Sequence, residues 1–179
     1  MAENTKESWL NYLALTTVIF AVCATLSTFK GGGFSTRSVM SQSQASDQWA
    51  YFQAKSIKAH LYELQKEKLE IELRILPKSA PQTVAEAYRE KIGEYQKRVE
   101  KLEKEKSEIQ AEAKRLEGDR DQTKRHSQAF GVAVIFLQIS ILLSSIAGLL
   151  KKRPVWYVGM AAGMIGLVYF ADGFFLFLG

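Results

Sequence analysis

The sequence predicts an all-α protein with three transmembrane helices and a long extramembrane antiparallel helical hairpin of coiled-coil type. Three observations predict this fold: apolar residues gather in long segments with almost no charge, apolar residues in the charged middle recur at heptad spacing, and the few prolines stand where turns are expected. A soluble domain mixes charged and apolar residues along every helix. Here residues 30–128 alone hold 20 of the 24 Lys and Arg and 16 of the 19 Asp and Glu.

Each predicted transmembrane helix is an apolar segment of at least roughly 20 residues, the length that a hydrocarbon core of about 30 Å requires. The three segments are residues 10–29, 129–150 and 155–178. Trp9 and Tyr12 stand at the start of the first segment, and Trp156 and Tyr157 at the start of the third. Aromatic side chains at such positions anchor helices in the membrane interface. Pro154 suits the first turn of the third helix.

The charged middle of the chain is expected to form a helical hairpin. The glycines at 31–33 should break the chain after the first span, and a serine or threonine within 35–38 should cap the next helix. Pro77 and Pro81 delimit a short turn, so two arms of equal length should run antiparallel. The expected parts are the N-terminal span at 1–30, the hairpin at 31–128 with its turn at 77–81, and two C-terminal spans at 129–179.

Both arms of the hairpin carry apolar residues at heptad spacing, and these two seams are expected to pack on each other. The first seam comprises Ala50, Ala54, Ile57, Leu61, Leu64, Lys68, Ile71 and Ile75, and the second Ile92, Tyr95, Val99, Leu102, Lys106, Ile109, Ala113 and Leu116. Lys68 and Lys106 occupy core-type positions, where a polar residue lowers stability but restricts register and copy number. Large side chains outside the first seam are expected to stay partly exposed and to favour a second hairpin: Trp49, Phe52, Tyr62, Leu69, Leu73 and Leu76.

Three aromatic side chains, Trp49, Tyr51 and Phe52, fall within four residues of the first arm. They exceed what one narrow seam can bury, so two interpretations stay open. The cluster is a contact with a partner or with another subunit, or it packs against the second arm near Ile109 and Glu112.

The segment around these aromatics, Asp-Gln-Trp-Ala-Tyr-Phe-Gln-Ala-Lys-Ser-Ile-Lys at 47–58, resembles the signature of a bacterial membrane-protein family catalogued only as a domain of unknown function. Members of that family are similar in plan, with one N-terminal span, a charged helical middle and two C-terminal spans. The resemblance covers nearly the whole chain, and its specific part is this segment. It implies a protein of the bacterial inner membrane and supplies no activity, substrate or catalytic residue.

Several polar and small residues lie inside the predicted spans. Asp172 is an acid in a segment expected in hydrocarbon, which suggests proton or ion handling, or a side chain that reaches the interface near the C-terminus. Gly159 and Gly163 form a G-x-x-x-G motif, which is either a close-packing face for a neighbouring helix or ordinary glycine usage. Gln138 is a weaker candidate for a hydrogen bond between spans.

The residue pattern argues against catalysis and against nucleic-acid binding. The net charge of +5 comes from basic residues that alternate with acids, so no single-sign patch for phosphates results. Cys23 is the one cysteine, and His60 with Glu63 and Glu67 has the reverse order of a di-iron motif. We therefore expect that the protein is not an enzyme and that it binds no cofactor, no metal and no small-molecule substrate.

The function predicted from these features is structural: a membrane-anchored scaffold or accessory subunit that forms a homo-oligomer or joins a larger membrane complex. Its contacts would be Trp49, Tyr51, Phe52, Lys68 and Lys106 in the hairpin and Gly159 and Gly163 in the bilayer. The alternative is an oligomeric channel or a transport accessory in which Asp172 lines a polar path.

The orientation of the chain in the membrane can be predicted from its short basic loop. Short loops obey the positive-inside rule, whereas loops longer than about 60 residues are largely exempt. The Lys-Lys-Arg loop at 151–153 and the N-terminus should therefore be cytoplasmic, and the hairpin and C-terminus periplasmic. A reporter that is active only in the periplasm should be active when inserted at Ser79 and inactive at Lys152. A reporter that is inactive at Ser79 and active at Lys152 would show that the predicted orientation is wrong.

Overall fold

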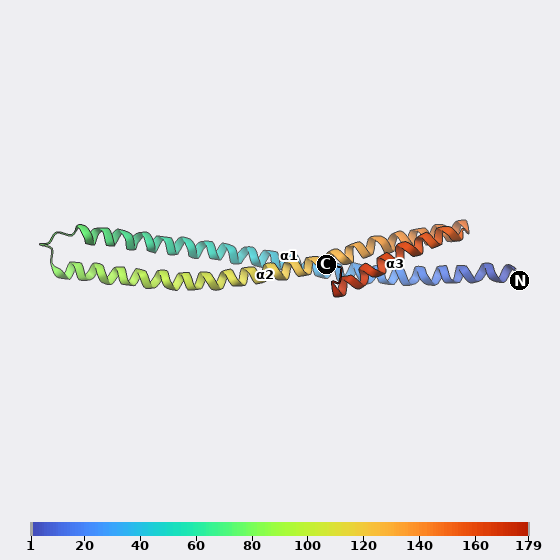
Figure 1. Ribbon diagram of the computed structural model, residues 1–179, viewed down its shortest axis with the longest axis horizontal. Coiled ribbons are helices and arrows are strands. Elements are labelled where there is room, and N and C mark those ends of the chain that lie inside the picture. The colour runs from blue at the N-terminus through green and yellow to red at the C-terminus, as the bar shows by residue number, and fades with distance from the viewer. Residues whose placement is uncertain (1, 179) are drawn as a thin grey trace. The chain divides into compact units, whose positions relative to one another are not determined.

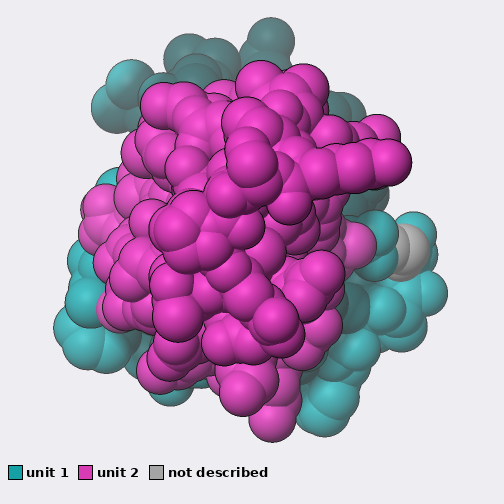
Figure 2. All heavy atoms as spheres, turned by 90° about the vertical axis from the view of Figure 1, so that its left-hand side faces the viewer, with its two compact units in different colours: residues 1–40, 119–179 teal, residues 41–118 magenta. Residues whose placement is uncertain are grey.

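The computed structural model describes residues 2–178, and within them it contains three long helices and no strand. The helices are α1 (Ala2–Ile75), α2 (Gln82–Leu150) and α3 (Arg153–Phe175) (Figure 1). The chain divides into two compact units, which Figure 2 distinguishes by colour: unit 1 holds residues 1–40 and 119–179, and unit 2 holds residues 41–118. The all-α prediction is confirmed.

The break expected at the glycines of 31–33 is not present, because α1 continues through them. The reason is a close contact within unit 1. A Cβ added at Gly31 would lie 3.0 Å from the Cβ of Phe130, and the Ser127 hydroxyl donates to the Gly31 carbonyl at 3.0 Å. Thr36 does not cap a new helix, since its hydroxyl donates to the Gly32 carbonyl four residues earlier in the same helix, at 3.1 Å. Gly31 therefore serves close packing, at a cost of about 1 kcal/mol of helix propensity relative to alanine, whereas a Cβ added at Gly32 or Gly33 would meet nothing within 4 Å.

Unit 1 is held together by glycines of α3 that meet large side chains of α1 and α2. A Cβ at Gly163 would overlap the Phe20 ring, and a Cβ at Gly166 would lie 2.8 Å from Leu137. The Ser140 hydroxyl donates to the Gly159 carbonyl at 2.6 Å. Phe20 and Leu137 belong with Ala24 and Ala133 to the buried core. Because glycine has no side chain, the helices approach closely enough for these rings and methyl groups to fill the space.

All three helices contain a stretch that is long and apolar enough to cross a membrane. Aromatic side chains gather at the end of unit 1 where α3 begins. The Trp9 and Trp156 ring centroids lie 6.3 Å apart, and the Arg153 guanidinium lies 5.7 Å from the centre of the Trp9 ring. Trp and Arg side chains of this kind are typical of the boundary between hydrocarbon and water.

The turn between α2 and α3 is made by the basic loop. Lys151 adopts a left-handed conformation with φ of 52°, and the Lys152 N–H donates to the Ala147 carbonyl at 3.1 Å. This bond ties off the C-terminal end of α2 in the manner of a Schellman motif, with lysine where glycine is usual. Pro154 lies in the first turn of α3, as predicted.

Unit 2 is an antiparallel hairpin formed by the second half of α1 and the first part of α2 (Figure 1). The two arms are joined by residues 76–81, in agreement with the predicted turn. Pro77 ends α1, and its carbonyl accepts the Ala80 N–H at 2.9 Å. The predicted seam of α2 is confirmed by its buried members: Val99, Leu102, Ile109, Ala113 and Leu116.

The predicted seam of α1 is wrong, because the opposite side of the helix faces α2. Five of its large members are between 56% and 74% exposed: Ile57, Leu61, Leu64, Ile71 and Ile75. The face toward α2 is instead formed by buried or half-buried residues, most of which had been expected to remain outside: Ala45, Phe52, Ala59, Tyr62, Leu69, Leu73 and Leu76. Residues such as Ile57 and Tyr62, five positions apart, point about 140° away from each other on a helix.

The choice between the two faces of α1 follows from size and polarity. Ala59 is fully buried and lets the arms approach closely, while Phe52 and Tyr62 reach over the seam of α2. The predicted face would have buried Lys68, whose side chain is instead 68% exposed and lies 3.8 Å from Glu72. Burying an ammonium group without a close partner is costly, so the face that contains Lys68 stays in solvent.

Candidate functional site

The polar contacts between the arms fix the register of the hairpin. The Trp49 indole N–H donates to Glu117 at 2.9 Å, and the Lys55 ammonium donates to Glu105 at 2.6 Å. Nearer the turn, Lys66 donates to Gln96 at 2.8 Å. As the residue number rises on α1 it falls on α2, so a slip of either arm would break all these contacts together.

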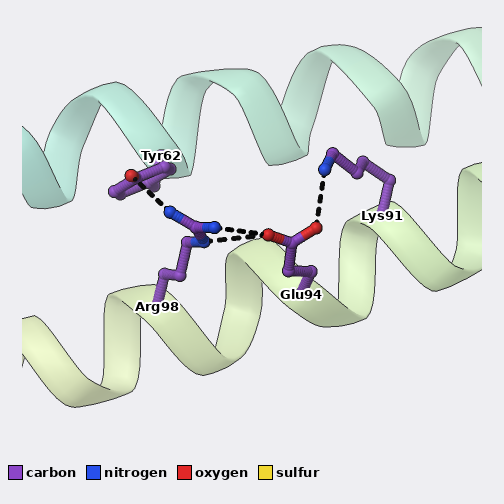
Figure 3. A network of polar contacts seen from close by, with 4 residues as sticks. All are labelled: Tyr62, Lys91, Glu94 and Arg98. Atoms are coloured by element: carbon purple, nitrogen blue, oxygen red, sulfur yellow. Dashed lines mark hydrogen bonds and ion pairs between the residues drawn. The ribbon is translucent and has the colours of Figure 1, made fainter.

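Glu94 is the centre of a polar network on the hairpin, and Figure 3 shows it between Lys91 and Arg98. Its carboxylate accepts from Lys91 at 2.6 Å and from Arg98 Nη2 at 2.6 Å, and Arg98 Nη1 donates to the Tyr62 hydroxyl on α1 at 2.9 Å. The hydrogen bonds from Lys91 and then from Arg98 lower the pKa of Glu94. The network is exposed, and it ties α2 to Tyr62 without forming an enclosed site.

Open cavities of modest size line this part of the hairpin. One of about 290 Å³ is bordered by seven residues, four of them basic: Lys55, Lys58, Tyr62, Arg98, Lys101, Leu102 and Glu105. Among the described residues, no group of three His, Cys, Asp or Glu comes together in a way that could hold a metal ion. His60 lies beside Glu63 at 2.9 Å on the exposed surface of α1.

The predicted aromatic cluster is divided between two environments. Trp49 and Phe52 are half-buried on the face toward α2, with their rings 5.6 Å apart in an edge-to-face arrangement. Trp49 meets the second arm at Glu117, and the Phe52 ring meets it beside Lys106, one helical turn from Ile109. Tyr51 is exposed, and the Lys55 ammonium lies 5.1 Å from its ring centre.

The two lysines predicted at core-type positions also differ. The Lys106 side chain is 13% exposed, lies 2.7 Å from Glu103 and stands 5.5 Å from the centre of the Phe52 ring. Lys106 is therefore an inner residue of the hairpin, as predicted. Lys68 is an outer one, because its position on α1 belongs to the face turned away from α2.

The outward face of α1 is the clearest unexplained feature of unit 2. We call it the outer stripe and define it by Ala50, Ala54, Ile57, Leu61, Leu64, Lys68, Ile71 and Ile75, all of them exposed. Its spacing alternates between four and three residues, which is the repeat of a helix-packing seam. The sequence already contained the signal that reveals it: α1 has two apolar faces at heptad spacing, whereas α2 has one, so a hairpin must leave one face of α1 uncovered.

Asp172 lies near the end of α3 and is 6% exposed. One carboxylate oxygen accepts the N–H of Leu178 at 2.7 Å, and its main-chain carbonyl accepts the N–H of Leu176 at 2.7 Å. Both bonds close the C-terminal end of the helix. A cavity of about 210 Å³ borders it, lined among others by Arg125, Gln128 and Tyr169.

The end of α3 is also bound to α2 through His126. Its Nδ1–H donates to the Gly173 carbonyl at 2.8 Å, and its ring stacks on Phe34 with centroids 4.6 Å apart. A Cβ at Gly173 would lie 2.7 Å from the Phe130 ring. These contacts hold the end of α3 against α2 and α1 within unit 1.

The remaining residues predicted within the spans do not share one surface. Gly159 and Gly163 are buried against residues of α1 and α2 from the same chain, which differs from the expected contact with another copy. Gln138 is exposed on α2. These three residues do not form a common site with Asp172.

The ion pairs of the hairpin predict how its stability depends on pH. The hydrogen bond from Lys55 lowers the pKa of Glu105, and Lys91 and Arg98 lower that of Glu94, so both pairs stabilise the fold above pH 4.5, the ordinary Glu pKa. This contribution is lost as pH falls below 4.5 through the lowered pKa values. Thermal unfolding of the purified protein, followed by circular dichroism, should therefore show a falling midpoint on the acid side. Glu94→Gln with Glu105→Gln should reduce that dependence. Equal pH profiles for this variant and the wild type would contradict the assignment.

The hydrogen bond to Leu178 predicts different outcomes for two substitutions of Asp172. Asp172→Asn keeps an oxygen that can accept the Leu178 N–H, so the thermal midpoint should hardly change. Asp172→Leu leaves that N–H without its acceptor and should destabilise the protein by about 1–3 kcal/mol. Ion flux through reconstituted vesicles provides the second readout. Flux in the wild type that disappears in Asp172→Asn at unchanged stability would contradict a purely structural role.

Comparison with known proteins identifies a family and no close relative. No curated protein and no solved structure matches the chain. One family does match, over residues 9–176, and this covers α2 and α3 completely and α1 from residue 9 onward. The chain belongs to the family described as Domain of unknown function (DUF4337).

Proposed function

We propose that this protein is a membrane-anchored structural protein, a scaffold or accessory subunit, that acts by helix association and carries out no catalysis. The observation that carries the proposal is the outer stripe of α1, with five large aliphatic side chains between 56% and 74% exposed. Exposed apolar surface of this extent and regularity is typical of a protein interaction site.

The proposed anchor is unit 1, in the inner membrane of a bacterium. Support comes from the three helices that are long and apolar enough to cross a bilayer and from the aromatic and basic residues at one end of the unit. The hairpin then lies outside the bilayer, because charged residues cover most of its surface.

The outer stripe favours association because it lies in water in the single chain. Burying one large aliphatic side chain is worth about 1.5–3 kcal/mol. Charged neighbours such as Lys58, Glu67 and Arg74 exclude a lipid-facing role for this part of α1, since charges in hydrocarbon are expensive. A second protein surface is the environment that removes these side chains from water.

The alternative function, an oligomeric channel or transport accessory, rests on Asp172. The hydrogen bond from the Leu178 N–H accounts for the burial of this acid without a polar path. Gln138, the other polar candidate, lies elsewhere on the surface of α2. The scaffold is therefore the function that the geometry supports better.

A photoreactive amino acid at position 64 tests whether the outer stripe contacts a protein. The full-length protein with Leu64 replaced in this way should form covalent protein adducts when intact bacterial membranes are irradiated. The matched control is the same replacement at Val84, an exposed aliphatic residue of α2 outside the stripe. If positions 64 and 84 give the same pattern, with no adduct specific to position 64, the stripe is not an interaction surface and the proposed function is wrong.

A further inference from the structure

We infer that the occupant of the outer stripe is a second copy of this chain, which pairs through its own outer stripe, in parallel and in register. This inference rests on the proposed function and deepens it, since it names the partner of the same surface. It follows from the length and repeat of the stripe, from the direction of α1, and from the charges around Lys68.

The stripe requires a helical partner with the same repeat. From Ala50 to Ile75 it extends about 39 Å at the helical rise of 1.5 Å per residue. A partner must offer a helix of similar length with apolar residues at alternating steps of three and four. The outer stripe of a second copy meets both requirements.

The α2 arm of a second copy does not meet them. Its apolar seam is already buried against α1 in the hairpin, through residues such as Val99, Leu102 and Ile109. Its remaining surface is charged, and the exposed residues include Lys97, Glu100, Lys101, Lys104 and Glu108. Pairing between copies through unit 2 is therefore a contact of α1 with α1.

The direction of the pair follows from the anchor. The apolar segment at 10–29 and the outer stripe belong to one continuous helix, α1. Copies inserted in one membrane have the same orientation, so their α1 helices run in parallel. The stripe also begins at the same distance along the helix in every copy, which places equal residues opposite each other.

The charges around Lys68 fit a parallel pair better than an antiparallel one. In a parallel pair a side chain at this heptad position lies beside the residue that precedes the equivalent position of the partner. Lys68 of each copy is then next to Glu67 of the second copy, while its own Glu72 lies 3.8 Å away. The two Lys68 residues are themselves opposite each other in this register, and Glu67 of one copy approaches Glu72 of the other, so each pair of like charges has the opposite charges directly beside it. An antiparallel pair centred on the stripe would instead place Lys68 opposite an isoleucine, Ile57.

Disulfide cross-linking of the full-length protein in its membrane tests both partner and direction. The background is Cys23→Ser, since Cys23 is the one native cysteine. Ile75→Cys lies at one end of the stripe, so oxidation should give a dimer in the parallel pair, where the two residues 75 are opposite each other. Val84→Cys, exposed but outside the stripe, is the matched control and should stay monomeric.

Two further variants test whether the stripe and its charges are responsible. Leu61→Gln with Leu64→Gln, in the Ile75→Cys protein, should weaken the association of the two copies. The rate of disulfide-linked dimer formation should then fall by about tenfold. Both leucines are exposed in the single chain, so circular dichroism should show the helices intact. Lys68→Glu should weaken dimer formation, and the swapped pair Glu67→Lys with Lys68→Glu should restore it.

The outcomes separate failure of this inference from failure of the proposed function. A dimer that requires a mixture of Ala50→Cys and Ile75→Cys proteins would overturn the parallel arrangement. Adducts at position 64 together with no disulfide in either experiment would show that another protein occupies the stripe; the scaffold would stand and the second copy would be excluded. No adduct and no disulfide would overturn both.

Discussion

A helix that is apolar on two sides cannot bury both sides against one partner helix, and this constraint governs the hairpin. The α1 arm has an inner face with Ala45 and Ala59, which are almost completely buried, and an outer face with Ile57 and Leu64, which are not. The α2 arm has a single apolar seam, so it can satisfy one face only. Folding of one chain therefore leaves the outer stripe in water, where the hydrophobic effect favours any process that covers it.

Unit 1 shows the opposite situation, because its helices use their close-packing residues on each other. Gly163, Gly166 and Gly173 of α3 face Phe20, Leu137 and Phe130, and no space remains at these glycines for a side chain from elsewhere. Asp172 and His126 likewise form hydrogen bonds within the chain: Asp172 accepts from the Leu178 N–H, and His126 donates to the Gly173 carbonyl. The consequence is a division between the units: unit 1 is closed at its glycine stripe, whereas unit 2 keeps an apolar face open.

The spacing of apolar residues predicted the packing face of a helix correctly where the helix has one apolar stripe, and failed where it has two. The all-α class, the turn after Pro77 and the buried seam of Val99, Leu102 and Ile109 follow from apolar spacing and proline position. The face of α1 that meets α2 could not be read in the same way, because both of its stripes have heptad spacing and the decision depends on contacts with α2, such as Trp49 with Glu117 and Lys55 with Glu105. The glycines at 31–33 were misjudged for a related reason: a local tendency to break the helix is overridden by Gly31 packing on Phe130, which no local pattern contains. The hydrogen bond from the Leu178 N–H to Asp172 at the end of α3 could not be predicted either, because it depends on the backbone path of the folded chain after the helix.

Lys68 and Lys106 occupy equivalent positions in their heptads, and the structure assigns them to different surfaces. Lys106 is enclosed in the hairpin, with Glu103 at 2.7 Å and the Phe52 ring at 5.5 Å, so its charge is satisfied by the same chain. Lys68 has Glu72 at 3.8 Å and otherwise faces solvent, so its surroundings are incomplete in the single chain. A polar residue in an apolar seam tolerates only registers that give it a partner. Lys106 thus restricts how the two arms of one chain align. Lys68 would restrict how the α1 helices of neighbouring chains align, in the same register that the common anchor favours.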